Sequence, residues 1–314
     1  MDSPPGESPG PRHFADRLAA LVLERRSQVV LGLDPDPAHL WPLAPGELPE
    51  APGAVAERTA AAVERHCRAA IEAAGPACVA VKLQLACFER LGWAGWRALE
   101  TVAAAARDEG LLLIADGKRG DVPVTARAYA QALVGQTPGP FGPVLGLGAD
   151  AFTANPLLGR DALEPLADAA ATAGAGCFCL VRTSNPGAAE LQDRPAPETP
   201  FHERLAELVD SLGRASIAEC GLSTVGAVTG ATRPDLLARL RGLMPRAVFL
   251  LPGVGAQGGE VDALRPAFAP HPAAGLVTAS RSIVDAHRSS GSDPAAAARA
   301  AAEDLRAETW ELSR

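Results

Sequence analysis

The 314-residue sequence lacks any apolar run near the roughly 18 residues that span a bilayer, and its Pro-, Gly- and Ser-rich start has no signal-like hydrophobic segment. Positive charge is also in deficit: 29 Lys and Arg stand against 37 Asp and Glu, a formal net charge of -8. The whole chain therefore has no electrostatic basis for nonspecific binding to nucleic acid or anionic membranes, although a local anion site remains possible. We expect a cytoplasmic protein whose partners include neither nucleic acid nor a membrane.

Cysteine and histidine are too scattered for the sites that they usually build. The six cysteines show no paired spacing except Cys177 and Cys179, which would point to opposite faces of a strand. Buried thiols are therefore expected, rather than a disulfide framework or a zinc site. The six histidines, among them His39, His66 and His202, are expected at the surface, so neither a zinc site nor a Ser-His-Asp nucleophile is predicted.

Short apolar segments rich in Val, Ile and Leu recur along the chain, and most are followed by Ala-rich stretches of helical composition. Eight strands are predicted, at residues 28–33, 78–83, 111–115, 150–154, 177–182, 224–228, 248–251 and 275–279. Helices are predicted at residues 55–74, 93–109, 124–133, 162–173 and 234–240, with a closing helix at 294–312. Near-continuous apolar strands that alternate with helices indicate a parallel sheet covered on both faces.

Eight strand-helix units over about 250 residues have the size of a (β/α)8 barrel, whereas an open doubly wound sheet usually has fewer strands. The predicted fold class is therefore α/β, a TIM barrel in one domain from residue 13 to 314. Residues 1–12 are expected to be a disordered tail, and the Pro-rich residues 191–200 a mobile surface loop.

Polar side chains follow nearly all of the predicted strands, at the end of the barrel where active sites of this fold lie. Contact with solvent alone would explain part of this pattern. The residues are Asp34, Lys82, Asp116, Lys118, Asp121, Asn155, Thr183, Ser184, Asn185, Thr229, Gln257, Ser280 and Arg281.

The most informative group follows the third predicted strand. Asp116 and Lys118 share one face of that strand if it stays extended, which places an ammonium beside a carboxylate. Asp121 follows one short turn later and can return a second carboxylate to Lys118, which would keep the amine charged and aimed as a proton donor. Alternatively, Asp121 is the N-cap of a helix that begins near Pro123. Spacing alone leaves both interpretations open.

A Gly-rich segment, residues 252–259, follows the seventh strand, and Ser280-Arg281 follows the eighth. The segment matches G-x-G-x-x-G, but no acidic ribose partner follows at the distance that a dinucleotide-binding domain requires. Barrels commonly bind a phosphate with these two loops, although a plain Gly-rich turn and a surface arginine would look the same. A charged Asp-Lys group opposite a phosphate site suits cofactor-free proton transfer to a carbon atom of a phosphorylated substrate.

Taken together, these segments resemble the orotidine 5'-phosphate decarboxylase family, and most closely its longer, type 2 branch. The resemblance is carried by residues 31–35, 81–89, 116–121 with Thr125, 183–187, 252–259 and 280–281. It implies decarboxylation of orotidine 5'-phosphate to uridine 5'-phosphate, the last step of UMP biosynthesis, by a homodimer that uses no metal or organic cofactor.

The resemblance also implies a role for each matching residue. Lys118 would protonate C6 as carbon dioxide leaves, Asp116 and Lys82 would belong to its charge network, and the partner subunit would lend Asp121. The substrate itself would be bound by Asp34 and Thr125 at the ribose, the latter across the interface, by Ser184 at the pyrimidine, and by Gln257, Gly258 and Arg281 at the phosphate. Residues 122–124 are Val-Pro-Val where the branch more often has Ile-Gly-Ser, which bears on the reach of Thr125.

Two other functions fit the same pattern. A phosphosugar lyase of the wider superfamily would use the Asp-x-Lys-x-x-Asp motif with Mg²⁺ to stabilise an enediolate. A catalytically silent homologue would only bind a nucleotide.

Overall fold

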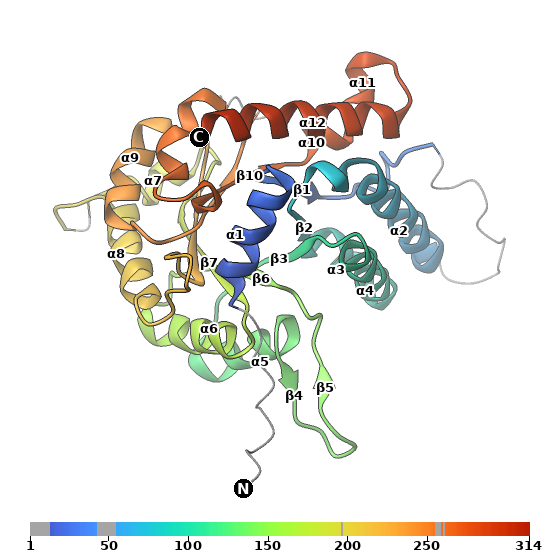
Figure 1. Ribbon diagram of the computed structural model, residues 1–314. Helices are drawn as coiled ribbons and strands as arrows, with labels where there is room; N and C mark the ends of the chain where they lie inside the picture. Colours follow the sequence, from blue (N-terminus) through green and yellow to red (C-terminus); the bar gives the residue numbers. More distant parts are fainter. Residues whose placement is uncertain (1–12, 43–54, 196, 255–258, 260) are drawn as a thin grey trace, which may run out of the picture.

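The computed structural model describes residues 13–42, 55–195, 197–254, 259 and 261–314. The tail predicted at residues 1–12 and the predicted phosphate ligands Gln257 and Gly258 lie outside the described residues. Eight parallel strands close into a barrel, in the order β1, β2, β3, β6, β7, β8, β9 and β10 (Figure 1). They are β1 (Val29–Leu33), β2 (Ala80–Gln84), β3 (Leu112–Arg119), β6 (Ala151–Ala154), β7 (Gly176–Arg182), β8 (Val225–Thr229), β9 (Phe249–Pro252) and β10 (Gly275–Ala279).

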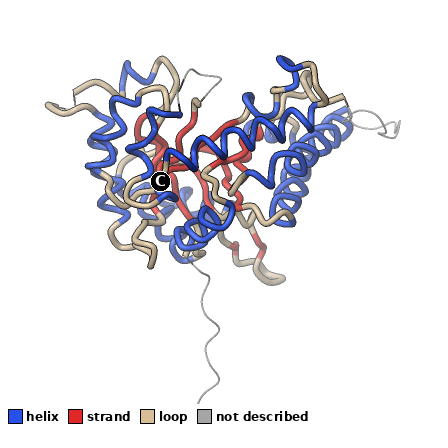
Figure 2. The backbone as a smooth tube through the Cα atoms, turned by 45° about the horizontal axis from the view of Figure 1, so that its top comes forward, coloured by secondary structure: helices blue, strands red, loops and turns tan. Residues whose placement is uncertain are grey.

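Helices surround this barrel and cover the outer faces of its strands (Figure 2). The longer ones are α2 (Val55–Ala74), α4 (Gly92–Asp108), α5 (Pro123–Leu133), α6 (Arg160–Thr172), α8 (Phe201–Gly213), α9 (Pro234–Leu243) and α12 (Pro294–Leu312). The short ones are α3 (Leu85–Glu89), α7 (Ala188–Leu191), α10 (Arg281–Val284) and α11 (His287–Ser290), with 3₁₀ turns η1 (Gly75–Ala77), η2 (Val261–Phe268) and η3 (Pro272–Ala274). The prediction of a (β/α)8 barrel is confirmed.

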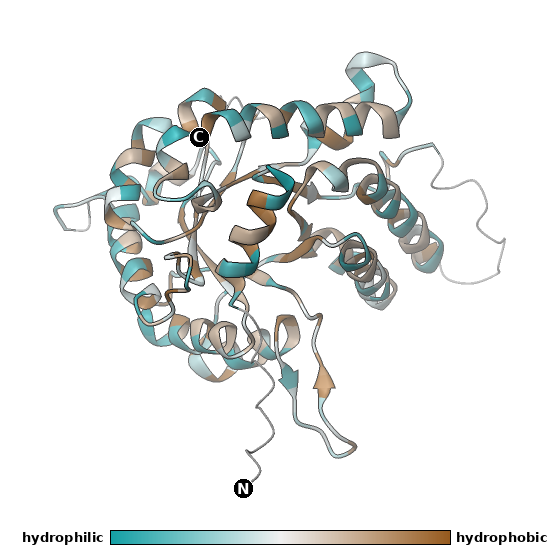
Figure 3. Cartoon of the chain, viewed as in Figure 1, coloured by the Kyte–Doolittle hydropathy of each residue, from teal (hydrophilic) through white to brown (hydrophobic). Residues whose placement is uncertain are grey.

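Two long helices, α1 (Phe14–Arg25) and α8, were not predicted. Helix α1 packs on the apolar residues that face the inside of the barrel. The ring of Phe14 meets that of Phe178 edge to face, with centroids 5.9 Å apart. Gly176 makes room for this contact, because a Cβ atom there would lie 2.6 Å from the Phe14 ring. Figure 3 shows apolar residues along α1 and the barrel strands, whereas hydrophilic residues colour much of the outer helices.

A two-stranded hairpin also departs from the prediction. Strands β4 (Gln136–Thr137) and β5 (Val144–Leu145) pair antiparallel between α5 and β6 and project from the barrel (Figure 1). Two-residue strands carry too little apolar alternation to be read from a sequence. The hairpin therefore adds an arm to the barrel without changing its topology.

The expectation that the histidines lie at the surface is wrong for His66 and His202, which are both buried. Each Nδ1 atom is satisfied by the backbone: that of His66 accepts from the N–H of Trp41, and that of His202 lies 2.8 Å from the carbonyl oxygen of Gln192. Both histidines lie on faces of α2 and α8 that point inward, where a hydrogen-bonded imidazole is tolerated. The six cysteines form no disulfide, and Cys67, Cys78, Cys177 and Cys179 are buried.

Candidate active site at the carboxyl ends of the strands

Asp116 lies at the centre of a charged cluster inside the mouth of the barrel. Its Oδ2 atom is 2.7 Å from Nζ of Lys82 on β2, and its Oδ1 atom is 2.7 Å from Nζ of Lys118 on its own strand, β3. Asp34, one residue beyond β1, has Oδ1 3.5 Å from Nζ of Lys82. Three adjacent strands thus bring together four of the predicted site residues in an alternating pattern of charge.

Burial and charge determine the ionisation of this cluster. The Asp116 side chain is only 6% exposed and that of Lys82 only 9%, so desolvation disfavours the charged form of each. For Asp116, the ammonium groups of Lys82 and Lys118 outweigh burial and hold its pKa well below the usual range. For Lys82, the carboxylates of Asp116 and Asp34 outweigh burial and raise its pKa. Asp116 is therefore a carboxylate, and Lys82 an ammonium, at neutral pH.

Two further side chains, which sequence reasoning missed, complete the hydrogen bonds of Asp116. The hydroxyl of Thr153 on β6 donates to Oδ1 at 2.8 Å, and Nε2 of Gln84 donates to Oδ2 at 3.2 Å. A polar residue within the apolar strand 150–154 was the one available signal for Thr153. With two ammonium groups, a hydroxyl and an amide around it, the carboxylate of Asp116 is fixed in position.

Lys118 has a strained backbone. Its φ angle is +48°, in the left-handed region that residues other than glycine rarely adopt. The pairing register between β3 and β6 shifts between Ala115 and Arg119, and the N–H of Lys118 donates to the hydroxyl of Thr153 at 2.8 Å. This bulge directs the Lys118 side chain back onto Asp116. Because 42% of that side chain remains exposed, the ammonium is both held by Asp116 and open to the mouth of the barrel.

Asp121 and Thr125 stand apart from this cluster. Oδ1 of Asp121 accepts the N–H of Val122 at 2.7 Å, and in the described part of the chain no hydrogen bond or ion pair joins Asp121 to Lys118. The interpretation of Asp121 as the N-cap is wrong, because α5 begins at Pro123 and its N-cap is Val122. Thr125 is exposed on the first turn of α5, beside Val124, which is 84% exposed.

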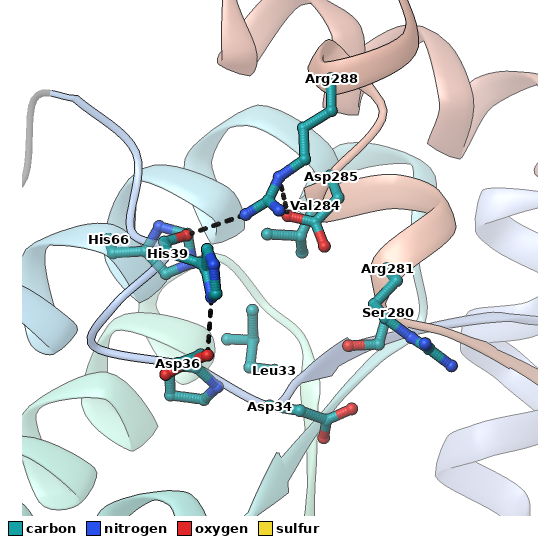
Figure 4. Close-up of a pocket in the computed structure, with 11 residues that line it drawn as sticks. Leu33, Asp34, Asp36, His39, His66, Ser280, Arg281, Val284, Asp285 and Arg288 are labelled. Atoms are coloured by element: carbon teal, nitrogen blue, oxygen red, sulfur yellow. Dashed lines mark hydrogen bonds and ion pairs between the residues drawn. The ribbon is translucent and has the colours of Figure 1, made fainter. Parts of the chain in front are cut away.

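Arg281 lies at the mouth beside Asp34, at the end of the neighbouring strand β10. It begins α10 directly after β10, and β10 pairs with β1, which leads into Asp34. Asp34, Ser280 and Arg281 line one cavity of about 250 Å³, whose wall is completed by Leu33, Pro35, Asp36, His39, His66, Val284, Asp285 and Arg288. Figure 4 shows Asp34 and Arg281 at the same side of this cavity. An anionic group of a ligand would find an exposed guanidinium here.

Ser184 lies two residues beyond β7, packed against the end of β8. A Cβ atom on Gly230 would come within 2.9 Å of the Cα atom of Ser184, so the two backbones meet without room for a side chain between them. Ser184 is therefore held at the mouth of the barrel with the other predicted site residues.

Two further observations concern metal binding and membrane insertion. Among the described residues, no three His, Cys, Asp or Glu side chains come together as metal ligands. Within the same residues, no helix has the length and apolar character needed to cross a bilayer.

Comparison with known proteins agrees with this geometry. A model of the orotidine 5'-phosphate decarboxylase / HUMPS family matches residues 27–301. The chain is 39% identical to orotidine 5'-phosphate decarboxylases of Rhodopirellula baltica, over 88% of this chain and 89% of the relative, and of Deinococcus radiodurans, over 86% and 88%. The solved structure of the Leishmania donovani OMP decarboxylase is similar, with a TM-score of 0.70 and 30% identity, covering 95% of this chain and 99% of that one.

Proposed function

The chain belongs to the orotidine 5'-phosphate decarboxylase / HUMPS family, and from this premise we propose that it decarboxylates orotidine 5'-phosphate to uridine 5'-phosphate, the last step of UMP biosynthesis. The observation that carries the proposal is the Lys82-Asp116-Lys118 cluster at the mouth of the barrel. A fixed ammonium in this cluster supports the proposal, because the reaction needs a positive charge next to the carbon that loses its carboxylate.

The chemical difficulty of the reaction is a carbanion. When the bond between C6 and the carboxylate breaks, the electron pair remains on C6 in the plane of the ring, where the π-system cannot delocalise it. Lys118 lowers the energy of this charge by electrostatic attraction and then transfers a proton from Nζ to C6, while carbon dioxide leaves. Because Asp116 holds that ammonium at 2.7 Å before the substrate arrives, little reorganisation accompanies the reaction.

The residues around the Lys82-Asp116-Lys118 cluster bind the nucleotide. Asp34 and Thr125 contact the ribose, Ser184 the pyrimidine, and Arg281 the phosphate together with Gln257 and Gly258. The shared cavity of Asp34 and Arg281 supports the first and last of these roles, since ribose and 5'-phosphate are adjacent in the substrate. Contacts with the phosphate, remote from C6, can contribute to the rate by enclosing the substrate.

The proposal includes a homodimer in which each site receives Asp121 and Thr125 from the partner subunit. Within its own subunit Asp121 does not reach Lys118. Asp121 and Thr125 each lie next to an exposed apolar side chain, Val122 and Val124 respectively. The turn before α5 packs on the loop after β6, because a Cβ atom on Gly120 would lie 2.6 Å from the carbonyl oxygen of Asn155. That loop adds two more exposed apolar side chains, Leu157 and Leu158. An apolar patch of this kind fits a subunit interface.

Three finer assignments belong to the same proposal: membership of the type 2 branch, catalysis without metal or organic cofactor, and a cytoplasmic location. The first is supported by the motifs that carry the resemblance, and the second by a proton donor provided by the chain itself. The third follows from the place of the reaction in nucleotide biosynthesis.

The experiment that tests the function follows the loss of orotidine 5'-phosphate absorbance with purified, EDTA-treated protein. We expect turnover that Mg²⁺ does not increase. Activity on a phosphosugar that requires Mg²⁺, without loss of orotidine 5'-phosphate, would support the lyase alternative. Binding of uridine 5'-phosphate without any turnover would identify a silent homologue.

A further inference from the structure

A second charged cluster lies behind the loop that carries Ser184. Arg182, the last residue of β7, is buried, with its side chain 6% exposed. Its Nε and Nη2 atoms donate to the two carboxylate oxygens of Asp193, at 2.9 and 3.1 Å. Arg233, in the connection between β8 and α9, donates to Oδ2 of Asp193 at 3.2 Å. Asp193 therefore joins two neighbouring strand ends, with Ser184 between them in the sequence.

The residues on either side of Asp193 and Arg182 extend this connection to the backbone beside Ser184. The N–H of Thr183 donates to Oε1 of Gln192 at 2.8 Å, and Nε2 of Gln192 donates to the hydroxyl of Thr183 at 3.0 Å. Nη1 of Arg182 donates to the carbonyl oxygen of Thr183. The peptide groups that lead into Ser184 are thus held from one side by Gln192 and Asp193, and from the other by the close approach of Gly230.

Residues 192 and 193 belong to the Pro-rich stretch 191–200, predicted as a mobile surface loop, and both make hydrogen bonds to neighbouring elements. His202 on α8 holds the segment from the other side: its backbone N–H donates to the carbonyl oxygen of Gln192 at 2.9 Å, and its ring lies 3.3 Å from Oδ1 of Asp193. A buried guanidinium needs a charged acceptor, and bidentate pairing also fixes its orientation. Asp193 provides that acceptor for Arg182.

We propose that Asp193 is a positioning residue for the pyrimidine: by tying Arg182 to Arg233, its carboxylate fixes the loop that presents Ser184 to the base. The inference rests on the proposed function, since it takes Ser184 as the contact to the pyrimidine. Asp193 touches no substrate atom itself. Its loss should weaken recognition of the base and leave unchanged recognition of the ribose at Asp34 and of the phosphate at Arg281, which follow β1 and β10 and are not neighbours of β7 or β8 in the barrel.

The test compares Asp193→Asn, which keeps the shape and removes the charge, with Asp193→Glu, which keeps the charge. Asp210→Asn is the matched control, because Asp210 also pairs with an arginine, Arg214, but within the outer helix α8. Steady-state kinetics give KM and kcat, and titration calorimetry gives affinities for uridine 5'-phosphate and for ribose 5-phosphate, which lacks the base.

We expect Asp193→Asn to raise KM for orotidine 5'-phosphate, and to weaken uridine 5'-phosphate binding, by about tenfold, the scale of a lost charge-assisted contact. Ribose 5-phosphate should bind as it does to the wild type, Asp193→Glu should recover part of the loss, and Asp210→Asn should behave as the wild type. If Asp193→Asn does not fold, Arg233→Gln replaces it, because that change removes the ion pair between Arg233 and Asp193 and keeps the one with Arg182. This variant should show the same selective loss of affinity for uridine 5'-phosphate, but a smaller one.

Unchanged KM and uridine 5'-phosphate affinity in a folded Asp193→Asn protein, even one with a lower Tm, would overturn the inference. An equal loss of affinity for ribose 5-phosphate would overturn it too. In both cases turnover by the wild-type protein would leave the proposed function standing, whereas a wild-type protein without turnover would refute that function.

Discussion

At the scale of single residues, the site depends on one carboxylate that serves two amines. Asp116 is buried, and burial alone would favour its neutral form; two ammonium groups reverse that preference. The same carboxylate then fixes Lys118, so the group that orders the site is distinct from the group that we propose as the proton donor. Among the described residues, the ion pairs of this network join Asp34, Lys82, Asp116 and Lys118 and do not include Arg281, so its proposed binding of the phosphate is separable from the proposed chemistry at C6.

This separation leads to a prediction for Arg281→Ala. Loss of a charge-assisted contact costs about 1.5–3 kcal/mol, so kcat/KM for orotidine 5'-phosphate should fall about ten- to a hundredfold. The comparison substrate is orotidine, which has no phosphate and should be processed equally by both proteins. An equal loss on orotidine would show that Arg281 does not bind the phosphate.

Sequence position was enough to name Lys82, Asp116 and Lys118, because polar residues at the carboxyl ends of barrel strands gather at one mouth. The regular alternation assumed for Lys118 is wrong, since the strand is bulged there and the φ angle of Lys118 is positive. Sequence position could not name Thr153 or Gln84 as hydrogen-bond partners of Asp116. The bond from Thr153 depends on how β3 is bulged against β6, and the bond from Gln84 depends on the register that pairs it with Asp116 across β2 and β3. The left-handed backbone of Lys118 could not be predicted either, because nothing in a lysine residue signals a positive φ angle.

At the scale of elements, the connection after β1 is anchored by Trp41. The indole N–H of this buried residue donates to the carbonyl oxygen of Val284 on α10 at 3.0 Å, and its backbone N–H donates to Nδ1 of His66 on α2 at 3.1 Å. The anchor thus joins three elements around the cavity that Asp34 and Arg281 share. It requires a neutral His66, because a protonated Nδ1 cannot accept a hydrogen bond.

The anchor predicts a pH dependence of stability. Burial lowers the pKa of His66 to about 4; the Asp285 carboxylate opposes this shift in part, and His287 lowers the pKa slightly further. In the unfolded chain the imidazole titrates near 6.5, so between these values the unfolded state binds more protons and stability falls as pH decreases. The folded state thus has its full stability above pH 6.5 and loses up to about 3 kcal/mol as pH falls to about 4.

His66→Gln should flatten this dependence. We expect the Tm of the wild type to fall more steeply than that of the variant between pH 6.5 and 4.5, measured by circular dichroism. Parallel Tm curves for the two proteins would show that His66 does not titrate with folding.

Element by element, the eight barrel strands were predictable because each is a short apolar run next to a helical stretch. Helix α1 was overlooked for a different reason: its apolar face, with Phe14, Leu18 and Val22, acquires a partner only when the strands close into a ring. The position of Asp193 had no sequence signal either, since its pairing with Arg182 and Arg233 joins segments that only the barrel brings together.

At the scale of the whole molecule, the proposed homodimer builds each site from two chains. Asp116→Asn and Asp121→Asn should each be nearly inactive alone, since one loses the network within the subunit and the other loses the lent carboxylate. A mixed dimer would contain one intact site, so random subunit exchange should restore about a quarter of wild-type activity.

The control for this experiment is a mixture of Asp116→Asn with Lys118→Ala. Both residues act within their own subunit, so no mixed dimer of that pair contains an intact site, and no activity should return. Failure of the first mixture to recover activity after demonstrated subunit exchange would remove the shared-site assignment of Asp121.

The central claim, that the ammonium of Lys118 delivers the proton to C6, is tested most directly by Lys118→Ala. The rate of uridine 5'-phosphate formation is measured in single turnover with protein in excess, and binding of inorganic phosphate is measured on the same samples. We predict no detectable product, with phosphate bound as in the wild type. Product formation at a near-normal rate would contradict the claim.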